Sequence, residues 1–161
     1  MMQQIVRTFW IFLRPLYRLY VRIFRPLTLG VRAIVLDDEG RVLLVRHSYV
    51  DGWYLPGGGV KRGETALSAV TRELDEEAGI LLKEDQRFEQ IGFLANFREF
   101  KSDHVVLYLV RPTQYEAVAR TSFEIAEYGF YAVDALPDET TRGTRARLAE
   151  FRNGEPAPVM W

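Results

Sequence analysis

Three glutamates near the middle of the chain are spaced so that they could act together on one ion. Glu73, Glu76 and Glu77 stand at positions i, i+3 and i+4 of a predicted helix, which places their side chains next to one another. Oxygen ligands of this kind suit a hard ion such as Mg²⁺ or Mn²⁺ rather than zinc. The same spacing also occurs on ordinary solvated helix faces, so both interpretations remain open at this point.

A run of three glycines, Gly57-Gly58-Gly59, precedes this helix. Backbone without side chains can approach a phosphate closely or offer a carbonyl oxygen to a metal ion. Mg²⁺ commonly shares its coordination shell with the phosphates of a substrate. Glycines and glutamates together therefore predict a loop–helix site for a metal-bound phosphate.

The order of residues from 58 to 80 narrows this interpretation. Gly58, Glu64 and the run Arg72-Glu73-Leu74-Asp75-Glu76-Glu77-Ala78-Gly79-Ile80 match every fixed position of the Nudix box. The chain therefore resembles the MutT-like Nudix hydrolases. The resemblance implies an α/β/α sandwich with a mixed sheet. It also implies hydrolysis, with Mg²⁺ or Mn²⁺, of a diphosphate that links a nucleoside to a second group.

The resemblance also assigns roles to residues of the box. It implies that Glu76 and Glu77 are metal ligands and that the carbonyl of Gly57 is a further one. Glu73 is either another ligand or the general base that activates water, and Arg72 orients it through a charge-assisted hydrogen bond. Glu64 supports the loop or the metal shell.

Other site residues are expected outside the helix. The family often adds one acid from the loop before a late strand, and here Glu124 is preferred to Glu127. The candidates for holding the substrate are Arg32, Arg46, Trp53, Gly58 and Arg98. For Trp53 the alternative is core packing, and for the three arginines it is an ordinary surface position. Neither of the family's markers for ADP-ribose or dinucleoside polyphosphates appears, because the corresponding positions hold Ala95, Asn96 and Phe97.

The residue pattern predicts the elements that position this site. A helix is expected at Thr65–Ala78, with an apolar stripe of Leu67, Val70, Leu74 and Ala78 that leaves the three glutamates outside it, and with Gly79 as its C-terminal cap. Strands at Thr28–Leu36 and Val42–Arg46 are expected to form a hairpin. Later strands are predicted at Gln90–Phe100, His104–Arg111 and Gly129–Val133, and a last helix at Glu139–Phe151.

Composition excludes several other classes of function. The 161 residues include no cysteine, which rules out disulfides, thiolate catalysis and cysteine-bound clusters. Outside residues 1–26, acidic side chains outnumber basic ones, 22 to 16. Binding of a nucleic-acid duplex is not expected, because it needs a concentrated basic face. The family resemblance implies a small nucleotide-type partner, and the expected location is the cytoplasm, either free or at a membrane surface.

Residues 1–26 differ in character from the domain expected at 27–161. They contain five arginines, no acid and 16 apolar or aromatic residues. The arginines follow one another at intervals of seven, four, four and three, which predicts a basic amphipathic helix. No uncharged stretch between arginines approaches the roughly 20 residues that span a bilayer. The helix could pack on its own domain, pair with a second subunit or lie on a membrane surface, or the segment could be disordered.

Two alternative functions remain open from the sequence. The chain could be a Nudix-fold module that binds nucleotides or regulates a partner without turnover, although such modules commonly lose acids that this box keeps. It could also be a hydrolase held at a membrane surface by residues 1–26, acting on a lipid-linked diphosphate.

Overall fold

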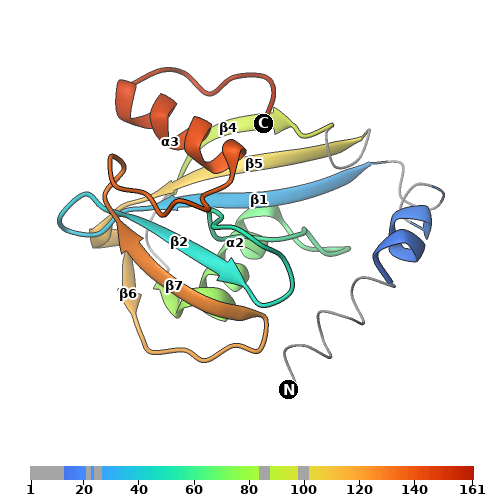
Figure 1. The fold of residues 1–161 in the computed structure, drawn as a ribbon, viewed down its shortest axis with the longest axis horizontal. Helices are drawn as coiled ribbons and strands as arrows, with labels where there is room; N and C mark the ends of the chain where they lie inside the picture. The colour runs from blue at the N-terminus through green and yellow to red at the C-terminus, as the bar shows by residue number, and fades with distance from the viewer. Residues whose placement is uncertain (1–12, 21–22, 24–26, 84–87, 98–101) are drawn as a thin grey trace.

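The computed structural model describes residues 13–20, 23, 27–83, 88–97 and 102–161 (Figure 1). Strands and helices are interspersed along these residues, as expected for a mixed α/β layer structure. In chain order the elements are β1 (Thr28–Val35), β2 (Val42–His47), α2 (Ala66–Ala78), β3 (Ile80–Leu82), β4 (Glu89–Ala95), β5 (Asp103–Val110), the 3-10 helix η1 (Pro112–Gln114), β6 (Tyr115–Ala117), β7 (Ile125–Tyr131) and α3 (Arg142–Asn153).

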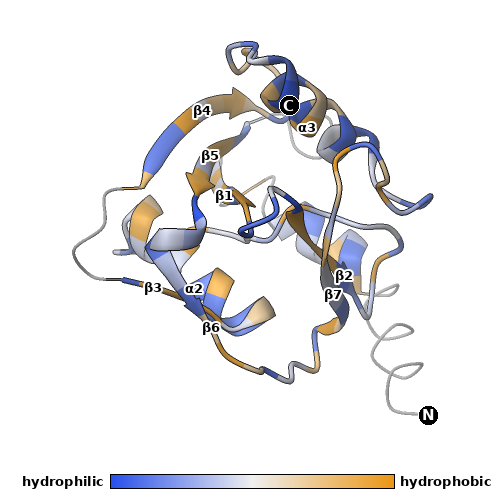
Figure 2. Cartoon of the chain, turned by 90° about the vertical axis from the view of Figure 1, so that its left-hand side faces the viewer, coloured by the Kyte–Doolittle hydropathy of each residue, from blue (hydrophilic) through white to orange (hydrophobic). Residues whose placement is uncertain are grey.

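A mixed three-stranded sheet forms the centre of the fold. Its order is β1-β5-β4, with β1 parallel to β5 and β5 antiparallel to β4. Two smaller antiparallel pairs, β2–β7 and β3–β6, complete the strand structure. Figure 2 shows α2 and α3 on opposite sides of the central sheet. The mixed sheet between helices confirms the α/β/α fold class that the sequence predicts.

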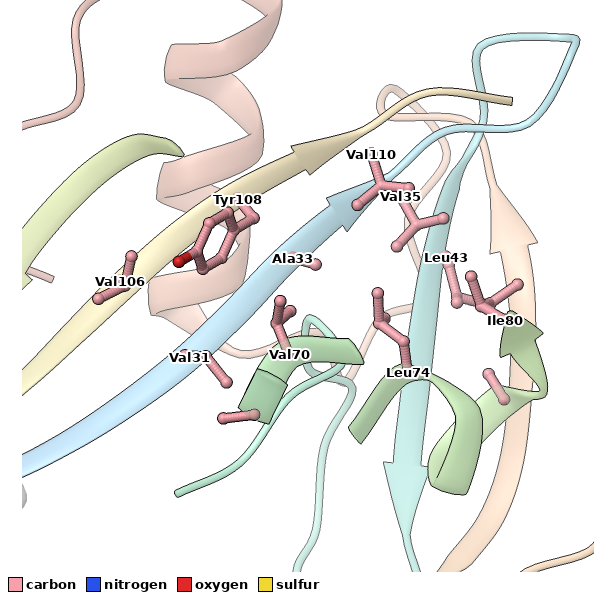
Figure 3. Close-up of a cluster of buried hydrophobic side chains, with 12 residues drawn as sticks. Val31, Ala33, Val35, Leu43, Val70, Leu74, Ile80, Val106, Tyr108 and Val110 are labelled. Carbon is pink, nitrogen blue, oxygen red and sulfur yellow. The ribbon is translucent and has the colours of Figure 1, made fainter. Parts of the chain in front are cut away.

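Each face of the central sheet has its own hydrophobic core. Successive strand residues point to opposite faces, so Val31 and Ala33 face α2 whereas Ile34 faces α3. Figure 3 shows Val70 and Leu74 of α2 directed at the strands of the first core. The second core lies under Leu148 of α3. Both helices are therefore fixed by apolar packing on the sheet.

Helix α2 begins and ends at the residues that its sequence predicts. The hydroxyl of Thr65 accepts a hydrogen bond from the Ser68 N–H at 3.0 Å, which satisfies a backbone donor of the first turn. Gly79 takes the left-handed conformation, φ 64°, and its N–H bonds the carbonyls of Leu74 and Asp75. These caps fix where the glutamates of the helix stand relative to the glycine loop.

The predicted apolar stripe of α2 is wrong at one end. Leu67 is 45% exposed, whereas Ala69, Val70 and Leu74 are buried. Glu77 is buried with them rather than presented outward. The physical reason is that the buried side of α2 passes through positions 70, 74 and 77, which follow one another at helical spacing. The orientation of α2 on the sheet therefore buries the carboxylate of Glu77.

The predicted hairpin of the first two strands is also wrong. A turn at 37–40 does connect β1 to β2, but β1 pairs with β5 and β2 pairs with β7. The other edge of β1 is occupied by the glycine loop, because Val31 N–H donates to Gly58 O at 2.9 Å and Ala33 N–H to Pro56 O at 3.0 Å. The strand edge that a hairpin would have used thus holds the loop of the candidate site.

The remaining elements agree with the sequence in kind and differ in their bounds. β4 ends at Ala95, before the predicted end at Phe100, and β7 begins at Ile125, before the predicted start at Gly129. The short strands β3 and β6 were not expected, and they pair only with each other over three residues. Their hydrogen bonds join segments far apart in the sequence, which local patterns do not reveal.

The segment after α3 packs against the domain. Ala95 N–H donates to Val159 O at 2.8 Å, and Trp161 N–H donates to Ala95 O at 2.9 Å. The buried Arg147 of α3 donates to the carbonyl of Met160 at 2.8 Å. A Cβ at position 143 would overlap the indole of Trp161, so the glycine there allows the ring to lie against α3. Residues 159–161 thus link α3 to β4.

Part of the predicted N-terminal helix lies within the described residues. Residues 13–20 are helical, and all of them are exposed (Figure 1). Residues 1–12, 21–22 and 24–26 lie outside the described part of the chain. Among the described residues, no helix combines the length and apolar character needed to cross a bilayer.

Candidate active site

The buried carboxylate of Glu77 is the centre of the candidate site. Its residue is 7% exposed, and its Oε2 accepts a hydrogen bond from the Gly57 N–H at 2.8 Å. Burial raises the pKa of Glu77 to about 8, and the negative charges of Glu73 and Glu124 act in the same direction. The Arg32 charge and the Gly57 N–H oppose this rise. A buried carboxylate with few neighbouring positive charges favours the binding of a cation.

His47 lies beside this carboxylate, which the sequence did not indicate. Its Nε2 is 3.8 Å from Glu77 Oε1. Burial and the neighbouring Arg32 lower the pKa of His47 to about 4, so the ring is neutral at neutral pH. An irregularity between Arg46 and His47 interrupts the register of β2 against β7. His47 lies next to Glu77 because β2 pairs with the distant strand β7. No pattern in the sequence around His47 predicts this position.

Arg72 joins the carboxylates that lie outside the core. It donates to both carboxylate oxygens of Glu64, at 2.9 and 3.1 Å, to Glu73 Oε1 at 2.6 Å and to Glu76 Oε2 at 3.2 Å. Its Nη2 also donates to the carbonyl of Gly59 at 3.3 Å. The bonds from Arg72 and from the Lys61 N–H lower the pKa of Glu64 to about 2. Arg72 therefore orients Glu73 as expected and ties the helix to the loop.

The glycines of the loop are required by close contacts. A Cβ on Gly58 would overlap the carboxylate of Glu73, and one on Gly57 would overlap the carbonyl of Val31. Gly57 also has a φ of 137°, a conformation that other residues rarely adopt. The loop thus lies directly against both the first strand and the glutamates of α2.

Two candidates from outside the box also lie near Glu77. Arg32 donates through Nη1 to the carbonyl of Gly57, the atom expected to bind a metal. Glu124 stands just before β7, where its carbonyl accepts a hydrogen bond from Ser48 N–H at 2.8 Å. Its charge raises the pKa of both Glu77 and Tyr49. Glu127, the alternative acid, instead forms an ion pair with Arg46 at 3.1 Å.

Two other substrate-binding candidates, Trp53 and Arg46, contact each other. Trp53 is 6% exposed and packs in the second core, so its ring is not open for stacking on a base. Arg46 lies over that ring, 5.8 Å from its centroid. Arg98 lies outside the described residues.

The residues present fit a divalent cation by their chemistry. Three carboxylates and the Gly57 carbonyl are the oxygen donors that Mg²⁺ prefers, and Glu77 is buried with few compensating charges. In the described part of the chain, no group of three acidic or histidine side chains is already arranged to hold a metal ion. The side chain of Glu76 is 56% exposed and is held by Arg72. A cation at this site would therefore have to draw Glu76 inward.

Comparison with known proteins identifies the class that this fold and site define. A family model described as the NUDIX domain matches residues 26–151. The chain belongs to this family. Among solved structures, the fold resembles a MutT NUDIX hydrolase from Burkholderia pseudomallei, with a TM-score of 0.60, 28% identity, and coverage of 76% of this chain and 95% of that one. It also resembles an ADP-ribose pyrophosphatase from Streptococcus suis, with a TM-score of 0.61, 25% identity, and coverage of 78% and 91%.

Curated relatives are matched over part of their length. An RNA pyrophosphohydrolase of Halorhodospira halophila is 49% identical over 57 residues, which are 35% of this chain and 30% of that protein. The mouse protein named 8-oxo-dGDP phosphatase NUDT18 is 30% identical over 131 residues, 77% of this chain and 38% of its own length. The matches thus span about a third of these relatives.

Proposed function

We propose that the chain hydrolyses the diphosphate bond of a small nucleotide-type substrate with the help of Mg²⁺ or Mn²⁺. The observation that carries the proposal is the pairing of a buried, poorly compensated Glu77 with a Glu73 that Arg72 holds against the glycine loop. Such a loop gives a phosphate access to backbone and carboxylates at once. If the glutamates only formed a solvated helix face, neither a buried Glu77 nor the close contact of Gly58 with Glu73 would be needed.

Each residue of the site has a role in this reaction. Glu76, Glu77 and the Gly57 carbonyl would hold the cation, which when bound withdraws charge from the diphosphate oxygens. Glu73, fixed by its 2.6 Å bond to Arg72, takes the proton from the attacking water. Glu124 is the second candidate for this role, since its charge reaches Glu77. The positive charge of Arg32 next to Gly57 is suited to a substrate phosphate.

The names of the relatives support a nucleotide-type substrate without selecting one. RNA pyrophosphohydrolase, ADP-ribose pyrophosphatase and 8-oxo-dGDP phosphatase all denote enzymes that act on phosphates linked to a nucleoside. The full chain should therefore be offered nucleoside di- and triphosphates, 5′-triphosphorylated RNA, ADP-ribose, nucleotide sugars, dinucleoside polyphosphates and lipid diphosphates. Products should be identified by mass spectrometry.

Substitution of the acids tests the site. Glu76→Gln and Glu77→Gln should lower kcat by about 100-fold or more, because each removes a charge that holds the cation. Glu155→Gln is a matched control, because this glutamate lies beyond α3 and bonds Asn153. Removal of divalent ions with a chelator should abolish turnover, and Mg²⁺ or Mn²⁺ should restore it. Unchanged turnover in both site variants would overturn the assignment.

A binding module without turnover remains the alternative, and the same panel distinguishes it. A substrate that binds tightly in calorimetry, with Mg²⁺ present, and emerges chemically intact would favour binding over hydrolysis. One substrate cleaved well above the others would establish the hydrolase and its specificity.

A further inference from the structure

The helical segment before β1 exposes a set of large apolar side chains. Residues 13–20 are helical and residue 23 follows them in helical conformation. Six large apolar side chains of this segment are between 38% and 67% exposed: Leu13, Leu16, Tyr17, Leu19, Tyr20 and Ile23. None of them belongs to the two hydrophobic cores of the described residues. The segment stands at the end of the molecule where β1 begins (Figure 1).

The segment has one apolar side and one basic side. At roughly 100° per residue, the six apolar residues fall within an arc of roughly 160°, and Arg14 and Arg18 lie outside it. This separation is typical of helices that lie in the plane of a membrane interface.

The distribution of charge indicates that this helical segment binds an anionic partner. Residues 1–26 contain five arginines and no acid, whereas the remainder of the chain has 22 acidic and 16 basic side chains. Two copies packed through the apolar sides of residues 13–20 would leave Arg14 and Arg18 of each copy on the outer faces, with no acid of residues 1–26 to pair with them. An anionic lipid surface accepts the apolar side and pairs the arginines with phosphate groups at the same time.

We propose that the helical residues 13–20, together with residue 23, bind this protein to the surface of an anionic lipid bilayer. The apolar side chains lie among the outer parts of the acyl chains, and the arginines contact the lipid phosphates. Because the domain is itself acidic, the attraction is confined to the segment, which leaves the catalytic domain in the water beside the membrane. The inference goes beyond the proposed hydrolysis and does not depend on it.

Vesicle co-sedimentation of the full chain tests the proposal. We expect binding to phosphatidylcholine vesicles that contain phosphatidylglycerol, weaker binding to phosphatidylcholine alone, and loss of binding as salt is raised. Leu16→Glu with Leu19→Glu should lower the partition coefficient by about tenfold or more, and so should Arg14→Glu with Arg18→Glu.

Control variants carry comparable changes outside the N-terminal helical segment. Arg142→Glu with Arg152→Glu alters two exposed arginines of α3 by the same charge, and Val159→Glu alters an exposed apolar residue. Both controls should bind vesicles as the unmodified chain does. Circular dichroism and turnover of a nucleotide in solution report separately on folding and on the proposed function.

Three results would overturn the proposal. The first is no sedimentation with phosphatidylglycerol vesicles. The second is equal loss of binding in the α3 control, which would indicate that net charge alone is responsible. The third is a dimer in light scattering that Leu16→Glu dissociates while vesicle binding is absent, which would assign the apolar side to a second copy of the chain.

Discussion

At the residue scale, Arg72 links the loop of the site to the helix that carries its glutamates. One guanidinium bonds Glu64 in the loop, Glu73 and Glu76 on α2, and the carbonyl of Gly59. The planar group can do this because its donors point in several fixed directions, which a lysine ammonium does not reproduce. Arg72 is therefore a positioning residue, since it acts through the acids that it holds.

Replacement of this guanidinium should affect chemistry more than folding. Arg72→Lys is expected to lower kcat by about 10- to 100-fold, as for other groups that orient metal ligands. The apparent affinity for Mn²⁺, measured by calorimetry, should fall with it. Arg111→Lys is a suitable control, because Arg111 pairs with the exposed Glu89. Normal kcat and Mn²⁺ affinity in Arg72→Lys would contradict the role given to Arg72.

Burial of Glu77 makes the stability of the metal-free protein depend on pH. Its pKa is raised from 4.5 to about 8 in the folded state, so between these values the folded protein binds a proton that the unfolded chain does not. The free energy of unfolding should therefore fall as pH rises through this window, by at most about 1.4 kcal/mol per pH unit. Above pH 8 this contribution is lost completely.

Denaturant unfolding in the presence of a chelator, at intervals from pH 5 to 9, measures this effect. Glu77→Gln cannot ionise, so its free energy of unfolding should lack this decline. Titrations of groups that do not interact with Glu77 occur in both proteins and cancel in the difference. A difference between the two proteins that does not change with pH would show that Glu77 is ionised throughout.

At the element scale, the glycine loop is part of the central sheet through its bonds to β1. Gly57→Ala should lower the free energy of unfolding by about 3 kcal/mol or more, because its Cβ would overlap the Val31 carbonyl in an unfavourable backbone conformation. Gly59→Ala should change it by no more than about 0.5 kcal/mol, because its Cβ meets no atom within 4 Å. Urea unfolding compares the two, and equal losses would contradict this account of the loop.

The same loop shows why the sequence predicts some elements and misplaces others. Caps and helical spacing are local, so Thr65 and Gly79 mark the limits of α2 correctly. Strand pairing is not local. The turn at 37–40 suggested a hairpin, whereas the loop at 56–58 bonds the edge of β1. Sequence spacing likewise located the glutamates of α2, but only packing on the sheet could show that Glu77 faces inward.

For the site, the motif placed Arg72, Glu73 and the glycines where the structure has them. The surroundings of His47 and Trp53 could not be predicted from the sequence, for a physical reason. Whether a side chain on a strand lines a site or fills a core depends on the neighbouring strand and on the layer above it. His47 adjoins Glu77 and Trp53 lies in the second core, and neither placement follows from its own segment.

At the scale of the whole molecule, residues 159–161 hold α3 and β4 together. Trp161→Ala should lower the free energy of unfolding by about 2 kcal/mol, because the partly buried ring packs in the second core and under the Arg147 guanidinium, 5.7 Å from the ring centroid. Val159→Ala, at an exposed side chain, should leave it nearly unchanged. Thermal unfolding followed by circular dichroism distinguishes them. Equal melting temperatures would show that the ring does not stabilise the domain.

The hydrogen bond from Gly57 to Glu77 makes one backbone proton a spectroscopic reporter of the site. An amide proton that donates to a carboxylate resonates further downfield when that carboxylate is ionised. Glycine amides occupy a sparsely populated region of a ¹H–¹⁵N correlation spectrum, where a single resonance can be followed. Titration of the Gly57 signal would thus trace the ionisation of a buried acid directly, and its shift on addition of Mg²⁺ would register the ion before any substrate is present.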